Sequence, residues 1–377
     1  MQDAEFTAIR DAVRQFIRDE VMPREAEIEE HDEVPDDLRG KAVAMGLFGY
    51  TLPEEYGGMN ATVTEDVQLA FEFGYTSLAF RSMFGTNIGI AGQVLVNYGS
   101  AEQKQAWLPR LAEGAVASFA LTEAEAGSDP SGMKSRAVPA GDGFFEISGS
   151  KRFITNAVIA DVFMVFARTG DEGTGGISCF LVEAGAPGLT IGPKDVKTGQ
   201  AGAWTSEVYL DRVRVPESAL VGGMAGAGFS AAMRSLSKGR LHIAGLCVGS
   251  AQRLLDESVA YARSNKQGGR PIGEFQLIQA MLAEMRTGLD AGRALVLDAA
   301  RRYDSGEDRK IGPSSAKLFC SEMAGRAADA AVQIHGGMGY MHGTTVERIS
   351  RDVRVMRIYE GTSEVQKLII GRALLRG

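Results

Sequence analysis

The sequence predicts an α+β multidomain protein with an N-terminal helical domain, a middle β-barrel or sandwich, and a C-terminal four-helix bundle. The chain has 377 residues, more than one hydrophobic core usually supports, so two or three packed units are expected. Apolar residues recur at helical spacing before about residue 111 and again after residue 228, and short runs of strand type lie between. We therefore expect domains at residues 1–116, 117–221 and 222–377.

The N-terminal part is predicted to be helical from Glu5 to about Leu111. Its first helix shows apolar residues every three or four positions. These are Phe6, Ile9, Val13, Phe16 and Ile17. The segments 67–73 and 103–111 repeat this spacing, and turn-forming residues within 52–58 separate them from the first helix.

The middle part is predicted to consist of strands. Short runs with alternating character occur at 144–147, 162–166, 177–182 and 208–210, and Gly, Pro, Asp and Asn separate them. Many short strands at close spacing favour a small barrel or sandwich over a parallel sheet.

The C-terminal part follows a glycine-rich linker at 222–228. Apolar residues then lie along one face of each of three long segments, at 233–259, 275–289 and 316–334, and a short fourth helix is expected after Glu364. Four helices with short links predict a bundle.

Composition excludes several classes of function. The net charge of -8 argues against nucleic acid as the main partner, because phosphate binding needs a concentrated positive surface. No apolar run approaches the roughly 18 residues of a membrane span. Residues 1–5 lack the basic flank and apolar stretch of a secretion signal. We therefore expect no membrane span and a cytoplasmic location.

Cysteine and histidine spacing gives no indication of a metal centre. The three cysteines are widely separated and odd in number, which argues against a disulfide framework or zinc cluster and favours a reducing compartment. They are Cys179, Cys247 and Cys320. The four histidines lack metal-ligand spacing, so we interpret each as a packed or capping residue and expect no metal. They are His31, His242, His335 and His342.

Two segments of the middle part could contact a cofactor. Residues 119–129 read FALTEAEAGSD, a strand that runs into a turn of small residues. Small residues let backbone amides approach an anion, so the turn can hold a phosphate, although an ordinary strand-ending turn has the same composition. Residues 151–156 read KRFITN, which also suits a barrel strand with one buried aromatic residue.

Two further segments near the C-terminus carry unusual motifs. Residues 333–340 read QIHGGMGY, and the pair Gly336-Gly337 permits close backbone approach to a nucleotide. Residues 358–366 read IYEGTSEVQ, in which Ser363 and Gln366 have capping-box spacing. A helix should therefore begin directly after the loop that carries the glutamate of this segment.

Together, and in this order, the four segments resemble the signatures of the FAD-dependent acyl-CoA dehydrogenase family over almost the whole chain. The resemblance implies that residues 121–128 meet the pyrimidine and pyrophosphate of FAD and that Phe153 covers the flavin ring. The glycine pair would meet the ADP part of an FAD held mainly by a partner subunit, which implies a homo-oligomer, a dimer or a tetramer. The implied cofactor contacts are Phe119, Leu121, Thr122, Gly127, Ser128, Phe153, Thr155, Gln267, Gln333, Gly336, Gly337, Thr362 and Glu364.

Glu360 is the expected catalytic base. Removing the proton beside a thioester requires a base whose pKa lies near the working pH, and a carboxylate reaches that pKa when it is desolvated. Without the resemblance, a solvated acid before a helix would be the more common interpretation of Glu360, and the resemblance reverses that order. Some family members carry the base in the segment that matches 237–240, but the corresponding position here is Gly239.

Arg81 is the main indication of the substrate. Its segment, AFRSMFGTN at 79–87, resembles that of glutaryl-CoA dehydrogenases, whose arginine pairs with the distal carboxylate of the acyl group. An arginine facing an acyl pocket needs such an anion, whereas a surface or helix-pairing arginine does not. The other implied substrate contacts are Ser128, Arg240, Tyr359 and Gly361.

One segment departs from the family pattern. The family has Arg-x-x-Phe-Gly before Pro-Ile and uses the arginine on the pyrophosphate of the partner's FAD. Residues 265–272 read NKQGGRPI, so both the arginine and the aromatic residue are missing, and Asn265 takes the place of the arginine. Either Lys266 or Arg270 replaces the charge, or FAD binding is weakened.

The leading hypothesis is an FAD-dependent oxidoreductase that dehydrogenates an acyl-CoA and passes electrons to an electron-transfer flavoprotein. One alternative is an acyl-CoA lyase, a decarboxylase or desulfinase, that acts on an acidic acyl-CoA with the same scaffold. Another is a non-catalytic protein that binds flavin or a CoA ester.

Overall fold

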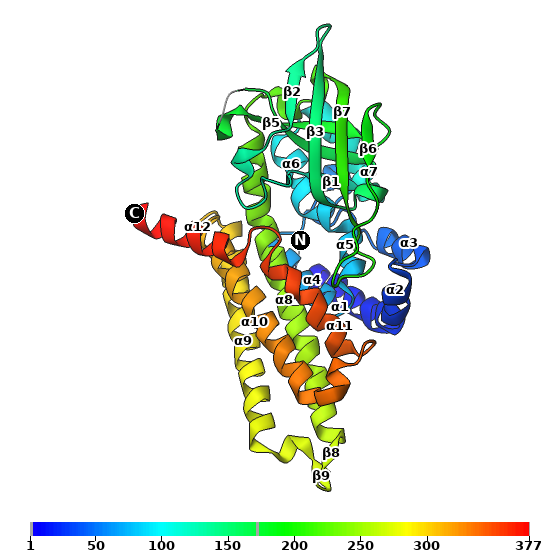
Figure 1. Ribbon diagram of the computed structural model, residues 1–377, viewed down its shortest axis with the longest axis vertical. Coiled ribbons are helices and arrows are strands. Elements are labelled where there is room, and N and C mark those ends of the chain that lie inside the picture. The colour runs from blue at the N-terminus through cyan, green and yellow to red at the C-terminus, as the bar shows by residue number, and fades with distance from the viewer. Residues whose placement is uncertain (1–2, 171–172, 377) are drawn as a thin grey trace.

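The computed structural model describes residues 3–170 and 173–376, so Met1 and Gln2 of the opening stretch lie outside it. Figure 1 shows a β-sheet at one end of the molecule, short helices at the centre and long helices extending to the opposite end. The expected fold class is therefore confirmed. The domain boundaries at 116/117 and 221/222 stay a prediction.

The helices and strands follow the expected order. The N-terminal helices are α1 (Asp3–Phe16), α2 (Glu25–His31), α3 (Asp36–Ala44), α4 (Val63–Phe73), α5 (Leu78–Ile88), α6 (Ile90–Tyr98) and α7 (Ala101–Ala112). The middle strands are β1 (Ala117–Ala120), β2 (Arg136–Pro139), β3 (Phe144–Thr155), β4 (Val162–Arg168), β5 (Ile177–Glu183), β6 (Leu189–Ile191) and β7 (Thr205–Pro216). The C-terminal elements are α8 (Gly228–Ser264), β8 (Lys266–Gln267), β9 (Arg270–Pro271), α9 (Gln276–Asp304), α10 (Ile311–His335), α11 (Thr345–Arg354) and α12 (Ser363–Arg376).

The start of α4 links the N-terminal helices to the bundle. Thr62 and Glu65 form a capping box, which satisfies two backbone N–H groups that have no partner within the helix. At the end of α9, the Asp304 carboxylate accepts hydrogen bonds from the backbone N–H groups of Val63 and Thr64, each at 2.9 Å. A negative charge at a helix N-terminus is favourable, so this cap also fixes the position of α9.

The sheet is mixed, with the order β1-β4-β2-β3-β7-β6 and with β5 paired to β4. β1 runs parallel to β4, whereas β3 and β7 form a long antiparallel pair whose register shifts between Ile147 and Gly149 and between Lys151 and Ile154. These two strands have twelve residues each, longer than the apolar runs indicated. Their polar positions stay in the ladder because backbone hydrogen bonds do not require apolar side chains.

Helices α4 and α8 approach each other closely. A Cβ atom added at Gly74 would lie 2.1 Å from the carbonyl oxygen of Leu246, and one added at Gly249 would lie 2.2 Å from that of Phe71. Only glycine permits such backbone contact between two helices. The 37 residues of α8 give it a length of about 55 Å, so it extends from the sheet to the far end of the bundle (Figure 1).

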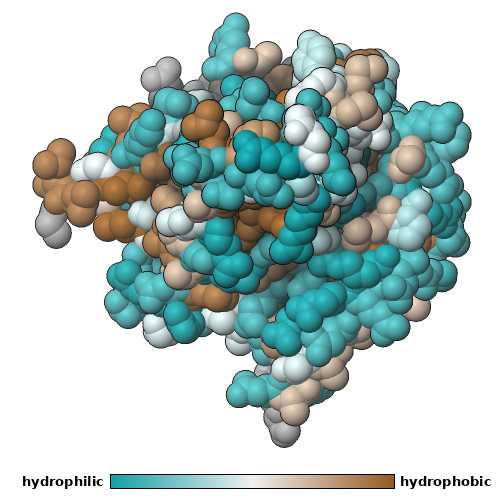
Figure 2. Space-filling view, turned by 90° about the horizontal axis from the view of Figure 1, so that it is seen from below, coloured by the Kyte–Doolittle hydropathy of each residue, from teal (hydrophilic) through white to brown (hydrophobic). Residues whose placement is uncertain are grey.

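The last helix, α12, projects from the body of the protein (Figure 1). Figure 2 shows its apolar side chains as a brown projection. Leu374 and Leu375 are 69% and 90% exposed, and Leu368 is also exposed. Before α12, the unpredicted α11 packs its buried Val346, Ile349 and Val353 against the bundle. Within the described residues, no helix combines the length and apolarity needed to cross a membrane.

Candidate active site

Glu360 lies on a tightly held loop before α12. It adopts the left-handed conformation, with φ 53°, and Gly361 follows with φ 92°. The carbonyl oxygen of Glu360 accepts hydrogen bonds from Arg240 Nε at 3.3 Å and Gln366 Nε2 at 3.1 Å. That of Gly361 accepts from Gln366 Nε2 at 2.9 Å and Lys317 Nζ at 2.8 Å. Three side chains from three helices therefore fix the backbone of this loop.

The cap of α12 differs from the one expected. Thr362, not Ser363, caps the helix, since its hydroxyl accepts a hydrogen bond from the backbone N–H of Val365 at 3.3 Å. The Ser363 hydroxyl instead donates to Glu322 at 2.6 Å. The capping box of Ser363 and Gln366 was therefore wrong, because Gln366 is used to hold the loop. Glu364, an expected cofactor contact, is exposed in the first turn.

The carboxylate of Glu360 is buried beside α8. Its Oε2 is buried without a hydrogen-bond partner among the described residues. A Cβ added at Gly239 would lie 2.2 Å from this oxygen, so glycine makes room for the carboxylate. Burial raises the pKa of Glu360. Positive charges oppose this shift, and they lie on Arg81, Arg240 and Lys317.

Lys317 is a feature of the site that the sequence interpretation missed. Its side chain is fully buried on α10 and donates a hydrogen bond to the Gly361 carbonyl. Burial lowers the pKa of Lys317 to about 8. Its only sequence signal was a lysine on the apolar face of a predicted helix.

A buried ion pair joins the two expected flavin segments of the sheet. Lys151 Nζ lies 2.7 Å from Glu123 Oε1, and Glu123 also accepts hydrogen bonds from the backbone N–H groups of Lys134 and Ser135. Burial lowers the pKa of Lys151, and the charge on Glu123 opposes that shift. This pair, which the sequence interpretation also missed, holds the turn that precedes Gly127.

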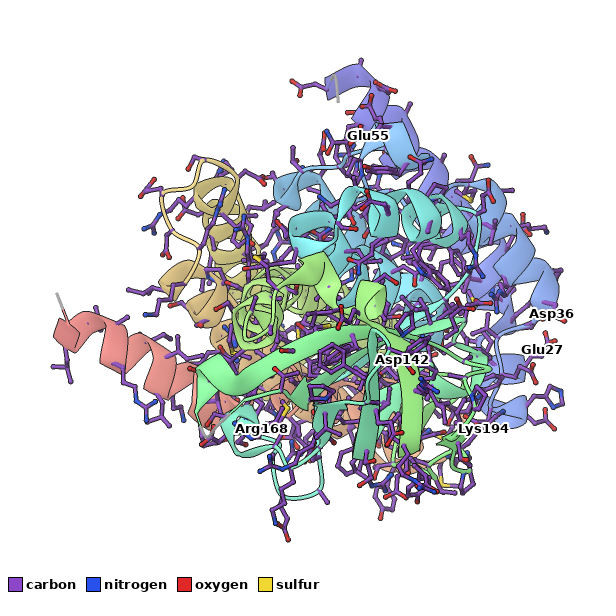
Figure 3. All side chains as sticks on the ribbon, turned by 90° about the horizontal axis from the view of Figure 1, so that it is seen from above. Glu27, Asp36, Glu55, Asp142, Arg168 and Lys194 are labelled. Atoms are coloured by element: carbon purple, nitrogen blue, oxygen red, sulfur yellow. The ribbon has the colours of Figure 1, made fainter. Side chains whose placement is uncertain are left out.

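The side chains of Phe119 and Leu121 are buried in the core under the sheet, so only their backbones can face a cofactor. Thr122 is partly exposed, and Gly127 and Ser128 are exposed at the turn. The loop after the turn is held by Arg168 (Figure 3), whose Nε donates to the Met133 carbonyl at 3.0 Å.

Phe153 is not the buried aromatic residue of an ordinary barrel strand. It lies at the register shift of β3, with φ 59°, and its side chain is 61% exposed. A bulge of this kind turns a side chain out of the ladder. Arg152 lies over one face of the ring, with 4.3 Å between guanidinium carbon and ring centroid. Thr155 is half-buried two residues later.

Arg240 and Tyr359, two expected substrate contacts, lie within the protein around Glu360. Arg240 is buried, and its Nε is occupied by the Glu360 carbonyl. Burial raises the pKa of Tyr359, which hydrogen-bonds the side chain of Gln200. Arg81 on α5 is partly exposed, and its Nε donates to His242 Nε2 at 2.7 Å.

The remaining cofactor contacts lie at the far end of the bundle. Gln267, Gly336 and Gly337 line an open hollow of about 1290 Å³, together with Asn265 and Arg270. The exposed Gln333 lies just before it, and its carbonyl oxygen accepts from the Gly336 N–H. Along α8, 26 residues separate Asn265 from Gly239, a distance of about 39 Å. The FAD contacts expected on the sheet and those expected at this hollow thus lie in separate parts of one chain, and Thr362 and Glu364 lie at the start of α12.

Metal and disulfide chemistry receive no support from the described residues. Among them, no group of three or more His, Cys, Asp or Glu side chains is placed to hold a metal ion. The three cysteines are buried free thiols.

Comparison with known proteins identifies the family. Three family models match: the N-terminal domain of acyl-CoA dehydrogenase at residues 3–115, its middle domain at 118–213 and its C-terminal domain at 226–375. An acyl-CoA dehydrogenase of Bacillus subtilis is 40% identical over 371 residues, which cover 98% of this chain and 97% of the relative. The chain belongs to the acyl-CoA dehydrogenase family.

Other relatives of this chain show the range of the family. The caffeyl-CoA reductase-Etf complex subunit CarC of Acetobacterium woodii is 38% identical, over 98% of this chain and 97% of the relative. Butyryl-CoA dehydrogenase from Megasphaera elsdenii has a TM-score of 0.95 and 32% identity, over 100% and 99% of the two chains. Glutaryl-CoA dehydrogenase from Mycobacterium smegmatis has a TM-score of 0.92 and 35% identity, over 100% and 96%.

An FAD complex of PigA is also similar, with a TM-score of 0.95 and 29% identity over 100% and 99% of the chains. The expectations of a flavoprotein oxidoreductase family, an enzyme and an FAD cofactor are thus confirmed.

Proposed function

We propose that this acyl-CoA dehydrogenase removes the α-proton of an acyl-CoA thioester with the carboxylate of Glu360. The observation that carries the proposal is the buried Oε2, which lacks a partner among the described residues and belongs to a carboxyl whose pKa is raised by burial. A base of this kind accepts a proton near neutral pH. Arg240, Gln366 and Lys317 hold the loop, so the carboxylate keeps a fixed direction.

The residues of the sheet fit an FAD molecule. The exposed turn at Gly127 and Ser128 presents backbone amides, and the exposed ring of Phe153 offers a flat apolar surface. Thr122 and Thr155 supply hydroxyl groups nearby. When bound, FAD supplies the acceptor for the hydride that leaves the β-carbon.

We further propose a homo-oligomer, in which the hollow at Gly336 and Gly337 holds part of a partner's FAD. About 39 Å of α8 separates this hollow from Glu360. This distance is longer than a single FAD molecule. The projecting α12, with its exposed leucines, supports an arrangement in which a second copy covers apolar surface. An electron-transfer flavoprotein as acceptor is supported by the relative named as part of an Etf complex. We also propose a cytoplasmic location.

The test is anaerobic bleaching of the flavin absorbance with butyryl-CoA and glutaryl-CoA. The Glu360→Gln variant should bind FAD and substrate and leave the flavin oxidised, because an amide cannot accept the α-proton. The exposed Glu55 (Figure 3) provides the control, and Glu55→Gln should bleach normally. Normal bleaching by Glu360→Gln would remove Glu360 from its proposed role.

A second candidate is decarboxylation of an acidic acyl-CoA on the same scaffold. Arg81 favours this reaction, because its positive charge interacts electrostatically with Glu360. Product analysis separates the two, since release of carbon dioxide from glutaryl-CoA indicates decarboxylation.

A further inference from the structure

The connection between β6 and β7 includes a short segment, residues 195–200 (the linking segment), that contacts both the sheet and α11. At its start, Asp195 accepts hydrogen bonds from Arg152 at 2.7 Å and from the Thr205 hydroxyl at 2.8 Å. The guanidinium of Arg152 also lies over the ring of Phe153, the expected cover of the flavin. This end of the linking segment is therefore tied to the flavin side of the sheet.

The other end of the linking segment lies directly against α11. A Cβ atom added at Gly199 would lie 2.6 Å from the carbonyl carbon of Arg351 and 2.8 Å from the backbone nitrogen of Asp352. The backbone N–H of Gln200 donates to the Asp352 carboxylate, and its side-chain Nε2 donates to the Asp352 carbonyl oxygen at 3.1 Å. Arg351 Nη1 donates to the Thr198 carbonyl oxygen at 3.2 Å. Backbone contact and hydrogen bonds therefore join the segment to the last turns of this helix.

Asp352 is held in a buried network of ion pairs. It is 3% exposed and lies 3.3 Å from Arg348, which in turn lies 2.9 Å from Glu25 on α2. Arg351 pairs with Glu29, also on α2, at 2.7 Å. Buried charges are stable only when they are paired, so this network fixes the end of α11 against the N-terminal helices. The linking segment thus contacts a rigid part of the fold.

Helix α11 leads into the catalytic loop within a few residues. The 3-10 turn Val355–Arg357 follows it, and the N–H groups of Ile358 and Tyr359 both donate to the Val355 carbonyl oxygen, at 2.8 and 3.1 Å. Glu360 comes next, eight residues after Asp352. A displacement of the end of α11 therefore displaces the proposed base.

The other supports of the catalytic loop come from the helical bundle. Arg240, Lys317 and Gln366 lie on α8, α10 and α12. They fix Glu360 to the bundle, whereas the expected flavin contacts lie on the sheet. The α-proton and the hydride leave adjacent carbons of one substrate, so the base and the flavin must keep a fixed separation.

We propose that the linking segment fixes the catalytic loop relative to the flavin face of the sheet, with Gln200 as its positioning residue. The inference rests on the proposed function of Glu360. Gln200 adopts the left-handed conformation, with φ 55°, and in it both the N–H and the side chain reach Asp352. Its amide also hydrogen-bonds the side chain of Tyr359, the residue before the base. Gln200 acts through these two residues and thereby sets the orientation of the carboxylate.

The first test compares kcat and KM of Gly199→Ala and Gly185→Ala in the FAD-loaded enzyme. The new Cβ at Gly199 would lie 2.6 Å from Arg351, whereas ordinary contact begins at 3.4 Å, so the segment must retreat by about 0.8 Å. Because misplacement by about 1 Å can lower a rate about 100-fold, kcat for the better of butyryl-CoA and glutaryl-CoA should fall at least about tenfold. KM and flavin content should stay unchanged, which a general loss of structure would not allow. Gly185→Ala adds a Cβ that meets nothing within 4 Å and should keep the wild-type kcat.

A second variant, Gln200→Met, separates the side chain from the backbone. Methionine has a similar length and the same backbone restriction at positive φ, but it cannot donate to Asp352 or to Tyr359. We expect kcat to fall about threefold to tenfold at unchanged KM, the usual range for one lost hydrogen bond. Gln105→Met, at an exposed position of α7, should keep both constants. If Gly199→Ala does not fold, Gln200→Met carries the test.

Hydrogen exchange of the full-length protein with bound FAD gives a readout apart from activity. The N–H groups of Ile358 and Tyr359 are protected by their hydrogen bonds to Val355. Loss of the linking contacts should let these bonds open more often, so deuterium uptake of a peptide covering 355–362 should be faster in Gly199→Ala and Gln200→Met. The two control variants should match the wild type.

Each adverse result overturns a particular statement. A kcat within about twofold of wild type in the folded Gly199→Ala and Gln200→Met variants, or unchanged uptake at 355–362, would refute the positioning role. A loss that lies in KM or in flavin content, with kcat preserved, would refute a role in orienting the base. If neither ester bleaches the wild-type flavin, the proposed function fails, while the exchange result still decides whether the linking segment holds the loop.

Discussion

Replacing Gly239 by alanine tests the geometry around Glu360 most directly. The new Cβ would lie 2.2 Å from Oε2 of the carboxylate, whereas ordinary van der Waals contact begins at 3.4 Å. The carboxylate must therefore retreat by about 1.2 Å. Its backbone cannot follow easily, because Arg240 and Gln366 hold the Glu360 carbonyl.

The expected effect is large on catalysis and small on stability. Misplacement of a reacting group by about 1 Å can lower a rate about 100-fold, which corresponds to about 2.7 kcal/mol in the activation barrier. Alanine in a helix is favoured over glycine by about 1 kcal/mol, which offsets the strain of moving a side-chain end. We therefore expect kcat to fall about 100-fold with little change in melting temperature.

The assay is the rate of anaerobic flavin bleaching under saturating acyl-CoA, together with the flavin content and thermal unfolding of each variant. Gly40→Ala is the matched control, because Gly40 lies in helix α3 and an added Cβ would meet nothing within 4 Å. That control should keep its rate. A Gly239→Ala enzyme with full flavin and a rate within threefold of wild type would refute the reasoning.

Three further changes have defined outcomes. Lys151→Met leaves Glu123 buried without its cation, so the free energy of unfolding measured in urea should fall by about 3–5 kcal/mol. The double variant Lys151→Met with Glu123→Gln should recover part of this loss. If the two single losses simply add in the double variant, the pairing is contradicted. The pKa of Lys317 is about 8 in the folded protein and has the ordinary value of 10.5 in the unfolded chain. Between these two pH values the unfolded state therefore binds more protons than the folded state. Lys317 should therefore make the free energy of unfolding rise over this range by up to about 3 kcal/mol, and Lys317→Met should lose that rise in urea titrations at pH 8 and pH 10. Asn265→Arg should increase FAD retention in gel filtration at low salt, since it adds a positive charge to the hollow at Gly336; equal flavin content in both proteins would count against that site.

Periodicity predicted the helices well because their buried faces are continuous. It predicted β3 poorly, since Gly149 and Lys151 interrupt the apolar pattern while the backbone ladder continues. It missed α11, whose charged residues outnumber the three apolar residues that it buries. A short helix with a narrow apolar face gives a weak periodic signal.

The loop position of Glu360 and the absence of a competing base at Gly239 were predicted from the sequence. The buried hydrogen-bonded residues around the site were not predicted from the sequence. His242 and Asp66 are 176 residues apart in sequence, and their contact depends on how α4 packs against α8. The sequence predicts a packed His242, and its burial confirms this, but its hydrogen bond to Arg81 depends on the packing of α5 against α8.

The glycine contacts between α4 and α8 also constrain how this protein can evolve. At Gly74 and Gly249 the backbones of the two helices are in direct contact. A segment inherited from a homologue with larger residues at these positions could therefore not pack against the other helix. Gene recombination with a crossover between Gly74 and Gly249 is therefore productive only when both parents carry the small residues. The helices must be inherited as a matched pair, although more than 170 codons separate Gly74 from Gly249.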